Sequence, residues 1–415
     1  MKISKKTTIQ YFLIYVLLFA SGSAWYTVSQ NAVYIVLAIA IITPLLVGKI
    51  AINQRFGAFL LAFTISIVLC RMINNGGIGL NYVIDFGTKA LIAYAAFCID
   101  RKAAAHRFIN VITFLAVFSL IGFVVSQIQP SILTDILPQY SRGNVRFGYD
   151  DIYYGKFLYT YQNPERNCGI YTEPALYQMI LICGLFVLLY APNITKLSEK
   201  NVVCRVIILT ITIVSTLSAT AYISYLVLVA PILFKKSKNT EKSKRYIGYI
   251  SFIVITALVV NFAIKGEKSI LSVYLIGKMN DMGTSSGNSL QSGDARIAVA
   301  QMALYSIIRH PFGIGAAGYA SMSLAWNYTN AAGNGLFYYL MVLGIFGWFI
   351  AISYIMIPAY DNKKNREAFV VFVVIYIIST VSQSYIFSPA FLFVSLLDMR
   401  RRVDNYNIYE VRKNE

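Results

Sequence analysis

The chain has 415 residues, of which 57% are hydrophobic and 13% are charged, and its net charge is +18. Repeated apolar runs of bilayer-spanning length predict a polytopic membrane protein and exclude an ordinary soluble enzyme. The excess positive charge lies in short segments between these runs, which is typical of membrane orientation rather than of nucleic-acid binding.

Twelve apolar runs are candidate membrane helices. They lie near residues 9–28, 32–48, 56–72, 81–99, 108–128, 174–191, 202–216, 220–234, 246–264, 334–359, 368–383 and 385–398. The last two are short and contain Pro389, so ten or eleven full spans also fit the pattern. The first run ends in small residues, but many spans follow it, so we favour a retained helix over a cleaved signal peptide. The predicted fold class is an all-α polytopic integral membrane protein with about 12 transmembrane helices, forming one transmembrane domain over residues 1–415.

The loops between the runs predict the orientation. If the N-terminus is cytoplasmic, the inner segments hold about two thirds of the 36 Lys and Arg residues, although the outer loops are much longer. Both termini are then cytoplasmic, and residues 129–173 and 265–333 form two large extracytoplasmic segments. No inner loop is long enough to fold as a nucleotide-sugar domain, an ATPase or a kinase. We therefore expect any chemistry at the outer face or within the bilayer.

The first outer segment combines basic and aromatic residues. Arg142 and Arg146 precede the stretch Arg166–Pro174, which reads RNCGIYTEP. The aromatic residues are Tyr140, Phe147, Tyr149, Tyr153, Tyr154, Phe157, Tyr159, Tyr161 and Tyr171. Tyrosines stack on sugar rings and bond their hydroxyls, and they also form the interfacial belt of any membrane protein. Their density here is higher than a belt requires.

Glu173 has two possible roles that the sequence leaves open. It directly precedes Pro174, the position of a helix N-cap, where the helix dipole favours a carboxylate. Alternatively, it is a base, or a ligand for a sugar hydroxyl, close to Arg166.

The second outer segment contains SGDARIAVAQMALYSIIRHPFGIGAAG, residues 292–318, which is too polar to cross a bilayer. Asp294 can cap a helix, and Pro311 disfavours helix at His310, so we predict a helix of about fifteen residues between them. Arg296 and Arg309 lie off its apolar stripe.

A glycine-rich turn that includes Gly313 and Gly315 follows this helix. Arginines beside an apolar surface, followed by a backbone rich in N–H groups, suit an anion such as a diphosphate. An interfacial helix whose arginines face lipid phosphates is an equally weighted alternative.

Other motifs carry less information. The hydroxyl-rich turn 215–220 is compatible with a polar cavity or with ordinary helix–helix contacts. The pattern G-x-G-x-x-G at 313–318 follows a helix rather than a strand, so it is not a dinucleotide fingerprint. His310 has no recognisable triad partners, no C-x-x-C pair exists, and two histidines are too few for a multi-histidine metal site.

Three motifs together resemble the bacterial oligosaccharide repeat-unit polymerases of the Wzy type, which share a superfamily with the O-antigen ligases. RNCGIYTEP resembles the polymerase signature R-x-x-G-x-x-x-E-P. Arg296 followed by IRHPFGIG at 308–315 resembles the arginine helix that ends in H-P-hydrophobic-G-x-G. Asn334 with Gly344 and Gly347 resembles the late span N-x-hydrophobic…G-x-x-G.

The resemblance implies a metal-independent, cofactor-free glycosyltransferase of the bacterial cytoplasmic membrane. Such enzymes move a growing glycan from undecaprenyl diphosphate onto the next lipid-linked repeat, as part of capsule, exopolysaccharide or O-antigen synthesis. The outer arginines would bind the donor diphosphate, and Glu173 or His310 would help to deprotonate the acceptor hydroxyl. The implied partners are the lipid-linked donor and acceptor, membrane lipids, a flippase and a chain-length regulator.

One departure and two alternatives accompany this resemblance. O-antigen ligases typically carry a histidine directly before the asparagine of this late span, whereas Gly333 precedes Asn334 here. This departure weakens the ligase hypothesis, which is the second enzyme alternative. A polysaccharide flippase or transporter is the hypothesis from another class, and it is disfavoured because no internal repeat is visible.

The predicted topology can be tested by cysteine labelling. A membrane-impermeant thiol reagent applied to intact cells should label cysteines introduced at Asn144 and Ser286, because both positions fall in the predicted outer segments. Labelling only after lysis would contradict the topology.

Overall fold

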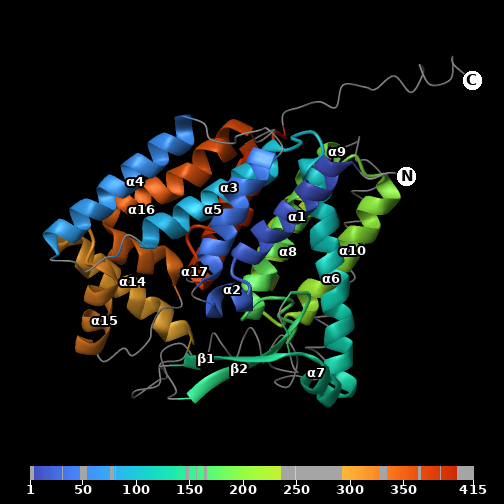
Figure 1. Cartoon of the computed structure of the whole chain (residues 1–415), viewed down its shortest axis with the longest axis horizontal. Helices are drawn as coiled ribbons and strands as arrows, with labels where there is room; N and C mark the ends of the chain where they lie inside the picture. Colours follow the sequence, from blue (N-terminus) through green and yellow to red (C-terminus); the bar gives the residue numbers. More distant parts are fainter. Residues whose placement is uncertain are drawn as a thin grey trace, which may run out of the picture.

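The computed structural model describes residues 4–29, 31–46, 54–74, 79, 81–144, 149–155, 157–162, 166–234, 248, 292–326, 334–362, 366–383 and 385–399. Its helices are α1 Lys5–Ala20, α2 Ala24–Val28, α3 Ala32–Leu46, α4 Gln54–Ile73, α5 Asn81–Cys98, α6 Ala104–Ile128, α7 Pro130–Ile136, α8 Pro174–Tyr190, α9 Pro192–Thr195, α10 Glu199–Ser215, α11 Ala219–Phe234, α14 Ser292–Arg309, α15 Gly315–Ala325, α16 Gly335–Asn362, α17 Arg366–Ser382 and α18 Pro389–Leu396. Its strands are β1 Gln139–Asn144, β2 Tyr149–Gly155 and β3 Thr160–Tyr161. The long helices form one bundle (Figure 1).

The bundle agrees with a helical membrane protein. Within the described ranges, α4, α6 and α16 are long and apolar enough to cross a membrane, judged by length and composition. Shorter apolar helices lie at Ala32–Thr43, Pro174–Tyr190 and Ala219–Leu233. The number of twelve spans stays a prediction, and the span expected at 246–264 lies outside the described residues except for Gly248.

The predicted first span is two helices rather than one. α1 ends at Ala20, and Gly22 adopts φ +111°, a backbone conformation that residues with a Cβ rarely adopt. The Ser23 hydroxyl then accepts from the Tyr26 N–H and caps α2. Ala24 N–H donates to the Ile170 carbonyl, so a distant segment fixes the break. Hydropathy cannot show this break because the residues around it remain apolar.

A three-stranded antiparallel sheet is the element that the sequence analysis did not predict. β1 pairs with β2, with Arg142 opposite Asp151, and β2 pairs with β3. Leu133, Tyr159 and Tyr161 form a small apolar cluster between this sheet, α6 and α7. Part of the aromatic density at 140–161 therefore serves to pack the sheet against the bundle.

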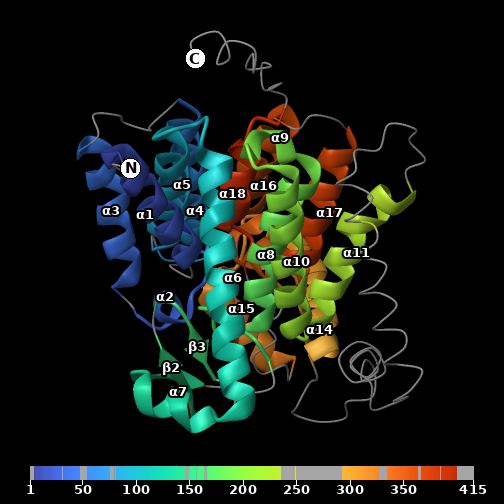
Figure 2. The same ribbon diagram turned by 90° about the vertical axis from the view of Figure 1, so that its right-hand side faces the viewer.

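The elements of both predicted outer segments lie at the same end of the bundle. Figures 1 and 2 show α7 and the sheet at the end that also holds α14 and α15. The start of α1 and α9 lie at the opposite end. This shared end agrees with the predicted map, while the side of the membrane that it faces stays a prediction.

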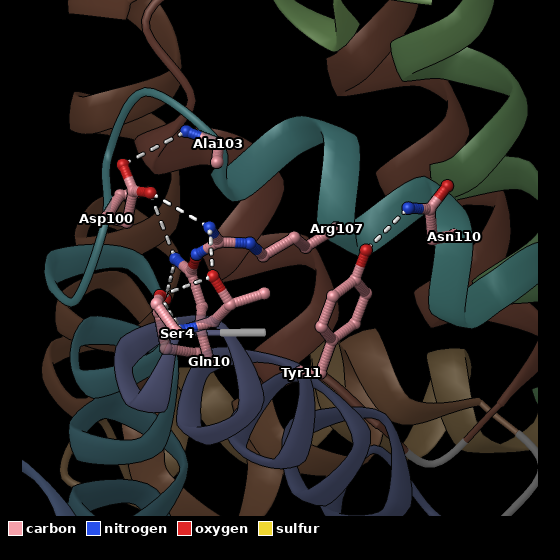
Figure 3. Close-up of polar contacts among 9 residues, drawn as sticks. Ser4, Gln10, Tyr11, Asp100, Ala103, Arg107 and Asn110 are labelled. Carbon is pink, nitrogen blue, oxygen red and sulfur yellow. Dashed lines mark hydrogen bonds and ion pairs between the residues drawn. The ribbon is translucent and has the colours of Figure 1, made fainter. Parts of the chain in front are cut away.

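A buried arginine joins α1 to the α5–α6 loop at the opposite end (Figure 3). Arg107 Nη2 lies 3.0 Å from Asp100 Oδ2 and donates to Thr7 Oγ1, and Arg107 Nη1 donates to Gln10 Oε1. Gln10 Nε2 in turn donates to the carbonyl oxygens of Ala96 and Asp100. The charge is paired and its donors are used, as burial of a charge requires, so this cluster is structural.

The glycine-rich turn after α14 packs into a break in α16. Gly344 has φ 71° and ψ 176°, which interrupts the helix. Ile345 N–H donates to the Pro311 carbonyl, and Ile314 N–H donates to the Met341 carbonyl, each at 2.9 Å. A Cβ on Gly344 would lie 2.4 Å from the Gly313 nitrogen, and Gly313 itself has φ 87°. Two glycines are therefore needed for this close backbone contact.

The contact predicts unequal effects of two glycine substitutions. Gly344→Ala should destabilise the protein by roughly 2–5 kcal/mol, because its Cβ meets backbone atoms and its φ is unfavourable for alanine. Gly57→Ala in α4 is the matched control: no atom lies within 4 Å of its Cβ position. It should stabilise the helix by roughly 0.5–1 kcal/mol. The thermal unfolding midpoint in detergent measures both effects. Equal midpoints for the two variants would contradict the close backbone contact between the turn at Gly313 and the break in α16, which we call the interlock.

Candidate functional site

The stretch Arg166–Pro174 is anchored through Asn167. Its N–H donates to the Ser215 carbonyl at 3.0 Å, and its side-chain amide donates to the hydroxyls of Ser215 and Ser119. Its Oδ1 accepts from the Gly169 N–H, which closes a tight turn at Gly169 with φ 58°. These bonds fix the segment against the α10–α11 connection.

Arg166 lies against the hydroxyl-rich turn that the sequence singled out. Its Nε donates to the Thr216 carbonyl at 3.3 Å and its Nη2 to the Leu217 carbonyl at 3.2 Å. Leu217 has φ 46°, which is uncommon for a residue with a side chain. The turn therefore presents backbone oxygens that orient the half-buried guanidinium.

Arg296 lies in the second turn of α14 and is held from α16 and α17. Its Nη2 contacts the Ser382 carbonyl at 3.5 Å. Its carbonyl accepts from Asn334 Nδ2 at 3.2 Å, while Asn334 Oδ1 accepts from Phe337 N–H at the start of α16. The Nε of Arg296 is buried and has no hydrogen-bond partner among the described residues. A buried donor without a partner is costly, and an anion at this position would satisfy it.

Glu173 stands before α8 without capping it through its side chain. Its backbone is extended, with φ −139° and ψ 145°, and its carboxylate makes no capping hydrogen bond. The residue is exposed. The carboxylate is therefore accessible to a ligand, although the helix dipole still acts on it.

Electrostatics place the two arginines and the glutamate in one neighbourhood. Burial lowers the pKa of the Arg296 guanidinium, and the Glu173 carboxylate opposes that shift. Burial raises the pKa of the Cys168 thiol to about 12, with Arg166 lowering it and Glu173 raising it. We refer to Arg166, Glu173 and Arg296 as the arginine site.

His310 and Arg309 lie far from the arginine site. Arg309 is the last residue of α14 and His310 follows it, thirteen and fourteen residues after Arg296, which corresponds to roughly 20 Å of helix. The Arg309 guanidinium stacks on the Tyr305 ring at 4.0 Å, and both residues are exposed. The structure thus separates the two candidate bases, Glu173 and His310.

The remaining candidates have other surroundings. Gly313 N–H donates to the His310 carbonyl, and Ile314 N–H is used in the interlock with α16, so these amides already have acceptors. Gly315 is buried at the start of α15. Arg142 lies in β1, and Arg146 falls outside the described residues.

The sequence analysis missed an ion pair inside an apolar run. Lys89 Nζ lies 2.6 Å from Asp85 Oδ2 in α5, and the Lys89 side chain is buried. The available signal was the spacing of four residues between opposite charges, which places them on one helix face.

No metal site is visible in the described part of the chain: no three His, Cys, Asp or Glu side chains lie close enough together to hold an ion. The chemistry of the arginine site is that of two guanidinium groups and one carboxylate.

Comparison with known families agrees with these motifs. Residues 204–352 match a family model described as O-antigen ligase. The match covers about a third of the chain, and it supports membership of the O-antigen polymerase/ligase superfamily. The matched segment contains the hydroxyl-rich turn, Arg296 and Asn334, whereas Arg166 and Glu173 precede it. A search of curated proteins gave no match.

We expect Arg166 and Arg296 to bind one anion, because Arg296 interacts electrostatically with Glu173 and Arg166 with the nearby Cys168. Arg166→Lys and Arg296→Lys keep the charge but lose the planar fork, so each should cost roughly 1.5–3 kcal/mol of binding, or about 10- to 100-fold in affinity. The measurement is titration of the purified protein with farnesyl diphosphate. Arg309→Lys is the matched control and should leave the affinity unchanged, because Arg309 lies at the far end of α14. A loss confined to Arg309→Lys would place the anion elsewhere.

Proposed function

We propose that this chain is a polymerase that joins undecaprenyl-diphosphate-linked oligosaccharide repeat units at the outer face of the cytoplasmic membrane. Superfamily membership supports an enzyme of the O-antigen polymerase/ligase type. The observation that supports the proposal is the arginine site, with a buried Arg296 Nε that lacks a partner among the described residues and interacts electrostatically with the accessible Glu173.

The arginines serve the donor. The anomeric carbon of the donor glycan is bonded to a phosphate oxygen, and that bond breaks as undecaprenyl diphosphate leaves. Negative charge then develops on the departing oxygen. Arg296, with its partly unsatisfied guanidinium, and Arg166 are placed to stabilise that charge, and stabilisation of developing charge lowers the barrier.

Glu173 serves the acceptor. A hydroxyl at the non-reducing end of the next lipid-linked repeat attacks the anomeric carbon, which forms the new glycosidic bond, and its proton passes to the Glu173 carboxylate. The carboxylate is exposed and makes no capping bond, so it is available for this transfer. The glycan has then moved to the acceptor, and the free undecaprenyl diphosphate is the second product.

A polymerase agrees with the arrangement better than a ligase does. The two charged residues of the R-x-x-G-x-x-x-E-P motif, Arg166 and Glu173, each act electrostatically on Cys168 between them, and both belong to the arginine site. The histidine typical of ligases before the late-span asparagine is replaced by Gly333, and His310 lies about 20 Å along α14 from Arg296.

The role of Glu173 is decided by comparing two variants. Glu173→Gln cannot accept a proton, so turnover of purified lipid-linked repeat units should fall about 10²- to 10⁴-fold. If Glu173 acted only on the dipole of α8, the variant would lose roughly 0.3–1 kcal/mol of stability and little turnover. His310→Ala should keep most of the turnover, because His310 lies at the other end of α14.

Polymer length and free undecaprenyl diphosphate are measured for both variants at matched protein levels. Full turnover of Glu173→Gln together with a collapse of His310→Ala would assign the base to His310 instead.

A further inference from the structure

The ion pair in α5 is part of a second polar cluster that the arginine site does not use. Asp85 Oδ1 accepts a hydrogen bond from the Tyr26 hydroxyl of α2 at 3.1 Å, and Asp85 Oδ2 accepts from Lys89. The Lys89 ammonium lies 5.2 Å from the centre of the Tyr385 ring and 5.8 Å from that of Phe86. We refer to Asp85, Lys89, Tyr26 and Tyr385 as the tyrosine cluster.

Burial makes this cluster expensive if it is only structural. The Lys89 side chain is 6% exposed, and a buried ion pair seldom stabilises a fold more than apolar residues of the same size. The ammonium has three donors, of which one contacts Asp85, and the rings of Tyr385 and Phe86 lie beside it. Ionisable residues inside a membrane bundle usually mark a ligand path.

The cluster is open at its acidic end. The Asp85 side chain is 25% exposed. On the preceding turn of α5, the Tyr82 hydroxyl lies 3.4 Å from the Tyr338 hydroxyl of α16. A carboxylate, an ammonium group and several tyrosines give the mixture of ring faces and directed polar groups that binds sugars.

The cluster lies next to the arginine site. Gly22 lies between Tyr385 and Leu176. A Cβ added to Gly22 would lie 3.1 Å from the Tyr385 ring and 3.4 Å from the Leu176 side chain. Leu176 belongs to the first turn of α8, where its N–H donates to the Glu173 carbonyl. Tyr385 also follows shortly after Ser382, whose carbonyl contacts Arg296. Ser382 and Tyr385, three residues apart, therefore connect the two groups of residues.

We propose that the tyrosine cluster binds sugar residues of the acceptor repeat and holds its terminal hydroxyl toward Glu173. This inference rests on the proposed function. Asp85 accepts from sugar hydroxyls, Lys89 donates to ring or hydroxyl oxygens, and the Tyr385 ring packs against the apolar face of a sugar. The donor diphosphate then occupies the arginine site while the acceptor occupies this one.

The test uses two probes, one for each group of residues. The first is the lipid-free repeat-unit oligosaccharide, released by mild acid from the producing strain's lipid-linked intermediate. The second is farnesyl diphosphate, which has no sugar. The variant Asp85→Asn/Lys89→Met removes both charges together, so that no unpaired buried charge remains. The matched control is Arg55→Met/Asp361→Asn, which removes an ion pair whose side chains are 63% and 44% exposed.

The expected result is a selective loss. Asp85→Asn/Lys89→Met should weaken oligosaccharide binding, measured by saturation-transfer NMR, about tenfold or more, and should raise the KM for the acceptor. Its affinity for farnesyl diphosphate and the properties of the control should not change. If the double variant fails to fold, Tyr385→Leu replaces it, because it removes only the ring and should weaken the oligosaccharide alone.

The outcomes separate this inference from the proposed function. Oligosaccharide affinity that is unchanged in a folded Asp85→Asn/Lys89→Met, or absent in the wild type, overturns the acceptor site and leaves farnesyl diphosphate binding as support for the arginine site. Oligosaccharide binding that depends on Asp85 and Lys89, in a protein that neither binds farnesyl diphosphate nor makes polymer, overturns the proposed function and keeps the sugar site.

Discussion

The attachment of α14 to α16 at both of its ends is the constraint on which the arginine site depends. At one end, Asn334 of the α16 N-terminus bonds the Arg296 carbonyl. At the other, the backbone of residues 311–314 pairs with α16 where Gly344 interrupts it. The apolar face of α14, with Val299, Met302 and Ala303, is buried in the core, and the contacts at its two ends fix its position further. A helix fixed at both ends keeps the guanidinium of Arg296 at a constant place relative to α8 and Glu173, and transition-state stabilisation requires such a fixed donor.

The two arginines are oriented in different ways, and the difference has a chemical consequence. Arg166 donates to two carbonyls of the α10–α11 turn, which aligns its plane. Arg296 makes one long contact and keeps a buried Nε without a partner among the described residues. A buried donor that has lost its water and has no protein acceptor gains the most free energy when an anion binds to it. Arg296 is thus suited to respond to charge, and Arg166 to position it.

Local signals in the sequence predicted several elements well. The helix expected between Asp294 and His310 is α14, Ser292–Arg309, which ends before Pro311 as predicted. The predicted cap is wrong, because α14 already includes Asp294 as its third residue. Pro174 marks the start of α8, as predicted. The breaks at Gly22 and Gly344 were not predictable, since each depends on a distant partner: Ile170 in one case and Pro311 in the other. Apolar neighbours hide such breaks from hydropathy.

The site itself was predictable only in part. Arg166, Glu173 and Arg296 were chosen from motifs; in the structure Glu173 interacts electrostatically with Arg296 and shares Cys168 with Arg166, while their roles stay a prediction. Proximity in sequence misled for His310, because a helix of eighteen residues carries its two ends far apart. The sequence analysis overlooked Asp85 and Lys89, because two opposite charges within one apolar run hardly change the average hydropathy of that run. Their significance comes from Tyr26 and Tyr385, which no spacing rule connects to α5.

The family match covers one of the three portions of the chain that build this region. Residues 204–352 supply Arg296, which we propose binds the donor diphosphate, together with Asn334 and the contact with α16 that hold its helix in place. Glu173, Asp85, Lys89 and Tyr26 come from the portion before it, and Tyr385 from the portion after it. A lipid diphosphate is common to every substrate of such an enzyme, whereas the sugars differ. In our proposal the residues that meet the variable sugars lie outside the matched segment, whereas the diphosphate ligands are divided, with Arg296 inside it and Arg166 before it. The family match therefore supports an enzyme of the O-antigen polymerase/ligase type without indicating its glycan.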